Sequence, residues 1–204
     1  DAASSGSINH KRAAVGQKNL ARADVPFDPL RTLATAAVPW HLSAMVVTEA
    51  LFRIGDTAQE DGNFALARQS FERGASLGDA ECLCRLAYMF DIGSGVETDK
   101  ALAMRLYQRA WRRGSTTAGM NIAILYRERG NSRAMFRWWK RVADTHDGSA
   151  QFEMAKCYLN GTGVRQDAQS ALRCLVAAVR SPYISEEERE EAQALLDTLR
   201  PHKV

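Results

Sequence analysis

The stretch LAYMFDIGSGVETD at residues 86–99 returns, with substitutions, as MAKCYLNGTGVRQD at residues 154–167. The two copies lie 68 positions apart (154 − 86), about twice the length of one helical-hairpin repeat. A shorter copy, IAILY at residues 122–126, lies between them. A period of about 20–50 residues indicates a stacked array, in which no unit can bury its apolar face alone. The pattern favours a surface that holds a partner over a pocket built for chemistry.

Composition sets few limits beyond an ordinary globular protein. The chain has 204 residues, of which 46% are hydrophobic and 25% charged, and its net charge is +3. A charge this small does not by itself indicate a nucleic-acid partner. The most apolar stretch, residues 33–47, is broken by Pro39, His41 and Ser43, so we expect no transmembrane segment.

The residues that usually carry chemistry are scattered. The four histidines (His10, His41, His146 and His202) fall in separate segments, and no two share a helix face at metal-ligand spacing. No nucleophile has a base near it in a recognisable motif. We therefore expect no catalytic residue, no metal site and no cofactor.

The four cysteines do not decide the redox compartment. Cys82 and Cys84 are two positions apart on a predicted helix, so their side chains diverge and do not easily bridge. Cys157 and Cys174 lie on facing helices of one predicted hairpin. Whether these two thiols form a disulfide or stay free in the core is left open by the sequence.

The chain divides into a tail and a helical region. Residues 1–29 are rich in small and polar residues and predict a flexible N-terminal tail, and residues 30–204 predict one all-α domain. Within it, apolar residues recur at spacings of three and four, which is typical of amphipathic helices. A short helix is expected over residues 30–38. We expect four helix-turn-helix repeats at about 39–77, 78–114, 115–146 and 147–180.

A final helix is expected to close the array over residues 185–199. Ser185 and Glu188 form a capping box at its start, and Ala192, Leu195, Leu196 and Leu199 form an apolar stripe. Such a helix covers the exposed apolar flank of the last repeat, as terminal caps do in solenoids.

The repeats resemble known families. The spacing of small and large residues in the first hairpin is similar to that of a tetratricopeptide repeat, and the next three hairpins resemble the Sel-one-like repeat (SLR) family. The loop of that family appears as GSGV at residues 93–96 and GTGV at residues 161–164. The third hairpin departs from the pattern, with a loop shortened to residues 127–132 and a Trp138-Trp139 pair in its second helix. The resemblance implies a right-handed α-solenoid.

The glycine loops admit two interpretations. Glycine tolerates the positive φ that turns a chain at the end of a helix, and Asp99 or Asp167 then stands where the next helix needs a side-chain acceptor. The alternative is a loop that cradles phosphate. The loops lack the third glycine, the preceding strand and the P-loop Lys-Ser/Thr of such a site, so we favour the structural role.

In solenoids of this kind the first helix of each repeat lines an inner groove, and the resemblance lets the inward positions be assigned by phase. The groove so defined is acidic at its N-terminal end, apolar in the middle and basic at its C-terminal end. An alternative is that Tyr88, Ile124 and Phe152 belong to the core. The partner-binding residues predicted from this phase are Phe52, Asp56, Glu81, Tyr88, Asp91, Met120, Ile124, Arg127, Phe152 and Lys156.

A second candidate surface is strongly basic. Ten cations fall within residues 105–141, with Trp111, Trp138 and Trp139 among them. Arginines interleaved with aromatic residues can bind phosphate backbones and stack on bases. The alternative, which we favour, is that the arginines form the solvated outer face of two second helices while the tryptophans fill the core. The ten residues are Arg105, Arg109, Arg112, Arg113, Arg127, Arg129, Arg133, Arg137, Lys140 and Arg141.

The sequence therefore predicts a non-catalytic module that binds one partner protein. Resemblance to the SLR family implies a bacterial, soluble protein, in the periplasm or the cytoplasm. Its most concrete form is an immunity protein that neutralises a secreted effector or toxin, and the alternative is a signalling or envelope adaptor. A different class, a binder of nucleic acid or another anionic surface through residues 105–141, is less favoured.

Overall fold

The structure, a computed structural model, describes residues 40–199, and within these residues it contains nine α-helices and no strand. The predicted tail over 1–29 and the predicted helix over 30–38 lie outside the described residues. The helices are α2 (Trp40–Glu60), α3 (Phe64–Ser76), α4 (Ala80–Ile92), α5 (Lys100–Trp111), α6 (Thr116–Glu128), α7 (Ser132–Ala143), α8 (Gly148–Asn160), α9 (Ala168–Arg180) and α10 (Glu186–Leu199).

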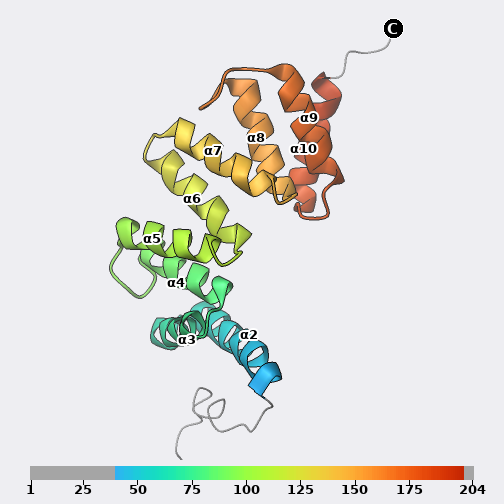
Figure 1. The fold of residues 1–204 in the computed structure, drawn as a ribbon. Helices are drawn as coiled ribbons and strands as arrows, with labels where there is room; N and C mark the ends of the chain where they lie inside the picture. Colours follow the sequence, from blue (N-terminus) through green and yellow to red (C-terminus); the bar gives the residue numbers. More distant parts are fainter. Residues whose placement is uncertain (1–39, 200–204) are drawn as a thin grey trace, which may run out of the picture.

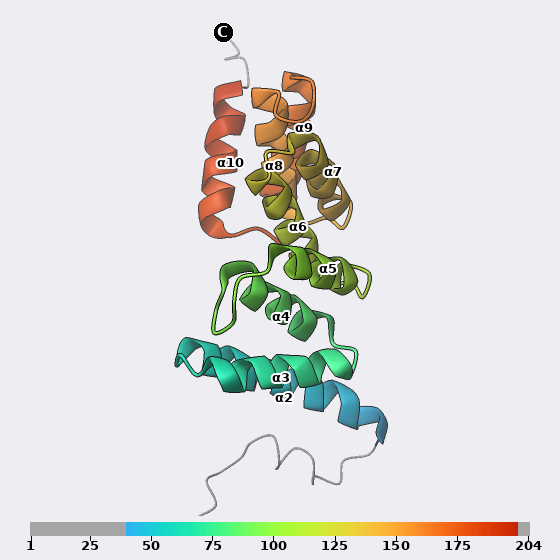
Figure 2. The same ribbon diagram turned by 90° about the vertical axis from the view of Figure 1, so that its left-hand side faces the viewer.

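The helices pack in sequence order into an elongated stack. The closest pairs are α2 with α3, α4 with α5, α6 with α7, and α8 with α9. Each pair then contacts the next through its neighbouring helices, and α10 packs against α9. Two perpendicular views show the pairs rising in order from α2 to α10 (Figures 1 and 2). The predicted all-α solenoid is confirmed for the part of the chain described.

Short polar side chains begin most of the helices. Seven residues before a helix each accept a hydrogen bond from a backbone N–H of its first turn, which satisfies a donor that has no partner within the helix. Ser185 and Glu188 form the predicted capping box at α10, since each side chain accepts from the backbone N–H of the other. The seven capping residues are Asn63, Asp79, Asp99, Ser115, Asn131, Asp147 and Asp167.

The glycine loops end two helices. Gly93 follows α4 at φ 78° and Gly161 follows α8 at φ 67°, and both adopt the left-handed conformation that a side chain disfavours. The first of these helices therefore ends at Ile92, directly before the first glycine of its loop. The shortened third loop turns at Gly130 instead, with φ 69°.

The core consists of alanines where helices meet and larger side chains between them. Ala87, Ala103 and Ala155 are fully buried and let neighbouring helices approach closely. Tyr107 is fully buried and Trp139 is 4% exposed, so the tryptophan occupies the same kind of core position as the tyrosine one repeat earlier. Trp139 therefore fills the core, as the favoured interpretation predicted, whereas Trp138 is only half-buried.

The cysteine question is settled for the described residues. All four cysteines are free and buried, and Cys157 and Cys174 both lie in the C-terminal part of the core without a disulfide.

Candidate partner-binding groove

Three first helices together form a hollow of about 420 Å³. Its walls come from α2, α4 and α6, the first helices of three successive pairs. Because no single repeat contributes more than one wall, the hollow exists only through the stacking of the repeats. It is lined by Phe52, Glu81, Cys84, Arg85, Tyr88, Thr117 and Asn121.

One end of this hollow is fixed by Arg85. The Nη2 of Arg85 lies 2.6 Å from Oδ1 of Asp56, and its guanidinium lies 5.5 Å from the ring centroid of Phe52. The Phe52 ring in turn packs against Phe71, with 6.3 Å between centroids. The guanidinium therefore links α4 to α2 and covers one aromatic wall of the hollow, so a ligand that needs Phe52 must displace or join Arg85.

The one thiol that lines this hollow, that of Cys84, is unreactive at neutral pH. Cys84 is buried, and the Nδ2 of Asn121 donates to its Sγ over 3.8 Å. Burial raises the pKa of the Cys84 thiol from 9.0 to about 11, so the sulfur is protonated at neutral pH. A thiol in this state is a poor nucleophile, and the hollow is suited to contact rather than to covalent chemistry.

The two basic groove residues lie in a second, smaller hollow. Arg127 and Lys156 line a space of about 270 Å³ with Met135, Glu153 and other residues of α7 and α8. Lys156 pairs with Glu153, and its Nζ lies 4.4 Å from the ring centroid of Phe152. Predicted contact residues therefore line two different hollows.

Two predicted contact residues are buried, and the prediction of an exposed position is wrong for both. Phe152 is 1% exposed and packs in the C-terminal part of the core, the alternative left open by the sequence. Asp91 is 7% exposed, accepts a hydrogen bond from the hydroxyl of Tyr107 over 3.2 Å, and pairs with Nζ of Lys100 at 2.6 Å. Asp91 thus ties α4 to α5 instead of facing a partner.

The remaining predicted residues are placed more favourably. Phe52, Glu81 and Tyr88 line the larger hollow, and Asp56 holds Arg85 at its edge. Met120 and Ile124 are half-buried against the core and line neither hollow. Their role in binding stays a prediction.

The predicted partner-binding residues leave out four that line the larger hollow: Cys84, Arg85, Thr117 and Asn121. Thr117 and Asn121 precede Ile124 by seven and three positions, so all three fall on one helical row. The spacing of α6 therefore indicates Asn121 as a groove residue. The prediction instead named its apolar neighbour Met120, which lies one position off this row. Arg85 follows Glu81 by four positions and precedes Tyr88 by three, so it lies on the same helical row as these two residues, and the spacing of α4 indicates it as well.

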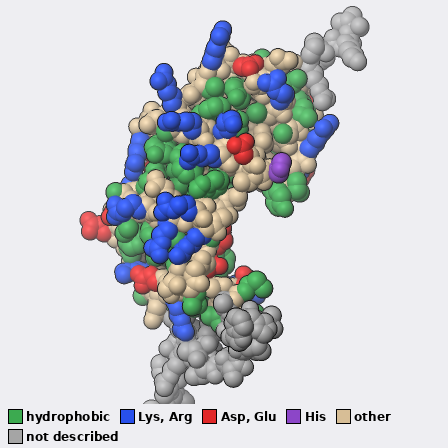
Figure 3. Space-filling view, in the orientation of Figure 1, with side chains coloured by type: hydrophobic (Ala, Val, Ile, Leu, Met, Phe, Trp, Pro, Cys, Tyr) green, Lys and Arg blue, Asp and Glu red, His purple; other side chains and the backbone are tan. Residues whose placement is uncertain are grey.

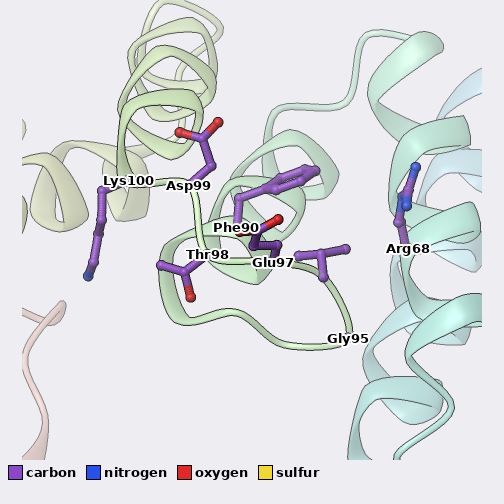
Figure 4. A pocket seen from close by; sticks show the side chains of 8 residues that line it. Arg68, Phe90, Gly95, Glu97, Thr98, Asp99 and Lys100 are labelled. Atoms are coloured by element: carbon purple, nitrogen blue, oxygen red, sulfur yellow. The ribbon is translucent and has the colours of Figure 1, made fainter.

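A further space of about 690 Å³ lies between α3 and the loop that joins α4 to α5. Figure 4 shows Gly95 at the tip of this loop, on the side that faces Arg68 of α3. The carboxylates of Glu97 and Asp99 line the space, which is unfavourable for a phosphate. Arg68 is already paired with Glu72 at 2.7 Å.

Close packing explains the glycine at the loop tip. Gly95 has φ 68°, and a Cβ there would lie 2.1 Å from Cβ of Phe64 on α3. Gly163 has φ 74°, and a Cβ there would lie 2.1 Å from the carbonyl oxygen of Ser132 on α7. Each loop thus rests on the second helix of the preceding pair, which agrees with the structural role.

Within residues 40–199, no group of three or more His, Cys, Asp and Glu side chains is arranged to hold a metal ion. In the same part of the chain, none of the helices combines the length and the apolar character needed to cross a membrane.

Comparison with known proteins places the repeats in a family. The Sel1 repeat model matches residues 80–115 and 148–181, the two segments that contain the paired glycine loops. The chain carries two Sel1 repeats. The first and third helix pairs are outside these two matches. No curated protein matches the sequence significantly.

Two solved structures share this fold. A Sel1 repeat protein from Oxalobacter formigenes is 20% identical with a TM-score of 0.61, over 85% of this chain and 80% of that one. A protective antigen of uropathogenic Escherichia coli with an SLR fold is 25% identical with a TM-score of 0.61. That match covers 78% of this chain and 35% of the antigen, so this Sel1 repeat protein spans about a third of its length.

Family membership gives a general function. Sel1 repeats generally mediate protein–protein interactions, and Sel1 repeat proteins are generally non-catalytic scaffolds. The two hollows therefore stand as candidate contact surfaces for a protein partner.

Proposed function

We propose that this Sel1 repeat protein binds one partner protein in the larger hollow, over α2, α4 and α6. The observation that carries the proposal is the convergence of Phe52, Tyr88 and Asn121 from three separate helices on one space of about 420 Å³. Half-buried aromatic side chains at the centre of a concave surface commonly carry most of the energy of an interface.

The chemistry of the hollow describes the segment that fits it. Tyr88 offers an apolar ring with a polar tip, Asn121 and Thr117 offer hydrogen-bonding groups, and exposed Glu81 adds a negative charge. A partner segment with one apolar side chain and a neighbouring basic residue would satisfy these groups. Arg85 is held by Asp56 and so contributes geometry rather than free charge.

In its most concrete form, the proposal is an immunity protein that neutralises a secreted effector. Resemblance to SLR proteins with such roles supports it. The test is the product of the neighbouring gene. If that gene encodes a toxin or lipase, this protein should form a stable complex with the product and abolish its activity. A signalling or envelope operon beside this gene would instead favour an adaptor and contradict the immunity role.

The site itself is tested with paired variants once the partner is in hand. Tyr88→Ala with Asn121→Ala should weaken binding by about tenfold or more, mainly through faster dissociation and with little dependence on salt. The matched control is Arg133→Glu with Arg137→Glu, two exposed residues on α7 outside the hollow, and it should bind as the native protein does. The opposite pattern, with the arginine variant losing the partner and the Tyr88 variant keeping it, would overturn the proposed site.

A further inference from the structure

Six arginines form two rows on the second helices of neighbouring pairs. Arg105, Arg109 and Arg112 follow one another along α5 at spacings of four and three. Arg133, Arg137 and Arg141 follow along α7 at spacings of four. All six are exposed. Figure 3 shows Lys and Arg side chains gathered over α5 and α7, with hydrophobic atoms between them and few carboxylates. We call these six residues the basic face.

The arginines of the basic face lack acidic partners within the described residues. The ion pairs of residues 40–199 are made by other side chains: Arg68, Arg85, Lys100, Lys156 and Arg189. Glu128, which lies between the two rows in the sequence, is held by Lys100 at 2.9 Å. Like charges four positions apart on one helix repel one another. The chain therefore maintains an unfavourable arrangement that a purely solvated surface does not require.

The surface between the rows is partly apolar. Trp138 on α7 meets Trp111 at the end of α5 edge-on, with 5.6 Å between ring centroids, and both rings are half-buried. The guanidinium of Arg141 lies 4.8 Å from the ring centroid of Trp138. Leu106, next to Arg105, is also half-buried. Tryptophan and arginine side by side, over half-exposed apolar atoms, are typical of protein–protein contact surfaces.

The same contacts disfavour a single-stranded nucleic acid. Base stacking needs an open aromatic face, but Arg141 covers Trp138 and Trp111 contacts it at its edge. Trp139 is 4% exposed and is therefore unavailable. We propose that the basic face is a second interaction surface, independent of the hollow over α2, α4 and α6, and that it docks an acidic protein segment in which Asp or Glu residues flank apolar side chains.

The test measures binding of charge-matched probes by the full chain. The probes are a labelled synthetic peptide that alternates Glu pairs with Leu, polyglutamate, and single- and double-stranded DNA of equal charge. The Glu-Leu peptide should bind most tightly, with an affinity that falls as salt rises. Arg109→Glu with Arg137→Glu, one change on each helix, should weaken its binding by about tenfold or more.

A matched control separates this surface from overall charge. Arg53→Glu with Arg165→Glu makes the same charge change at two exposed arginines on α2 and in the loop before α9, and should leave peptide binding nearly unchanged. If the Glu variant of the basic face fails to fold by circular dichroism, Arg109→Gln with Arg137→Gln removes the charge without reversal and should still lose affinity.

Three outcomes would overturn the proposal. The first is that no probe binds, which leaves a solvated face without a partner. The second is that either DNA binds more tightly than the Glu-Leu peptide, which assigns the face to nucleic acid. The third is that the control and basic-face variants lose affinity equally, which means that net charge rather than this surface attracts the peptide.

Discussion

Gly163 shows how one missing side chain joins two repeats. Its φ of 74° and the 2.1 Å between an added Cβ and the Ser132 carbonyl oxygen leave no room for alanine. Gly163→Ala should therefore lower the free energy of unfolding by roughly 1–3 kcal/mol from backbone strain alone, and by more from the contact with α7. Urea unfolding followed by circular dichroism measures the loss.

Gly130 is the matched control for this prediction. It has a similar φ of 69°, but no atom lies within 4 Å of an added Cβ. Gly130→Ala should cost only the strain of a left-handed residue, about 1–2 kcal/mol. Equal losses for the two variants would mean that the loop does not press on α7. A stable Gly163→Ala that no longer binds its partner would instead make the loop a recognition element.

Buried thiols give the protein a pH dependence at the alkaline end. Burial raises the pKa of Cys157 from 9.0 to about 11, so the thiol stays protonated in the folded state after it has ionised in the unfolded one. Its contribution is fully present below pH 9 and is lost as the pH rises from about 9 to 11.

Comparison with Cys157→Ala isolates this effect from other alkaline groups. The native protein should lose stability faster than the variant over this range, by up to about 1.4 kcal/mol per pH unit for this one group. Urea unfolding at several pH values measures the difference, and parallel curves for the two proteins would contradict the assignment.

Single residues differ in how far sequence alone can place them. The glycines and capping aspartates were predictable because their roles depend on local backbone geometry, which a short motif specifies. Phe152 was not, because its position depends on how far α8 is rotated against its neighbours. Phe152 and the half-buried Tyr88 are both aromatic residues on first helices, and only packing between repeats separates core from surface.

At the scale of the helix, the arginine row of α7 has a cost that can be measured. Arg137 has Arg133 four positions before it and Arg141 four after it, and all three are exposed. Arg137→Gln should raise the free energy of unfolding by about 0.2–0.5 kcal/mol for each relieved pair at low salt. The gain should disappear at high salt, because screening removes the repulsion.

Arg68 on α3 provides the control for this prediction. It is paired with Glu72 four positions on, at 2.7 Å, with both side chains nearly half exposed. Arg68→Gln should therefore leave stability unchanged or lower it by a few tenths of a kcal/mol. A fall in stability for Arg137→Gln would show that the row has a folding role and would weaken the argument for a docking surface.

Whole elements were more predictable than the surfaces that they form. Apolar spacing correctly predicted an all-helical array, because each helix buries one stripe in a regular array. The limits of the hollows were not predictable in the same way. Arg85 shares a helical row with Glu81 and Tyr88, but its ion pair with Asp56 on α2 joins separate helices, and such a contact leaves no periodic trace in the sequence.

At the scale of the molecule, the core consists of three clusters that share side chains. The first, N-terminal cluster contains Phe71, the second, central cluster contains Tyr107, and the third, C-terminal cluster contains Trp139. Phe90 and Leu106 pack against both the first and the second cluster, and Trp111, Tyr126 and Trp138 pack against both the second and the third. Each repeat is thus stabilised mainly by its neighbours, as in other solenoids. The hollow over α2, α4 and α6 therefore depends on the N-terminal and central clusters and little on α10.

This arrangement predicts that damage at the C-terminal end stays local. Leu196 on α10 is 3% exposed and packs in the third cluster, so Leu196→Ala should destabilise the end of the array by roughly 2–5 kcal/mol. Hydrogen exchange measured peptide by peptide should show faster exchange in α8, α9 and α10, with α2, α3 and α4 unchanged. Binding through the larger hollow should persist, because its walls belong to the protected part.

Leu83→Ala, at a 2% exposed residue of the second cluster, is the matched change and should speed exchange around that hollow. If Leu196→Ala instead accelerates exchange equally in α2 and α10, the clusters unfold as one cooperative unit, and the groove depends on the whole array rather than on its nearest repeats.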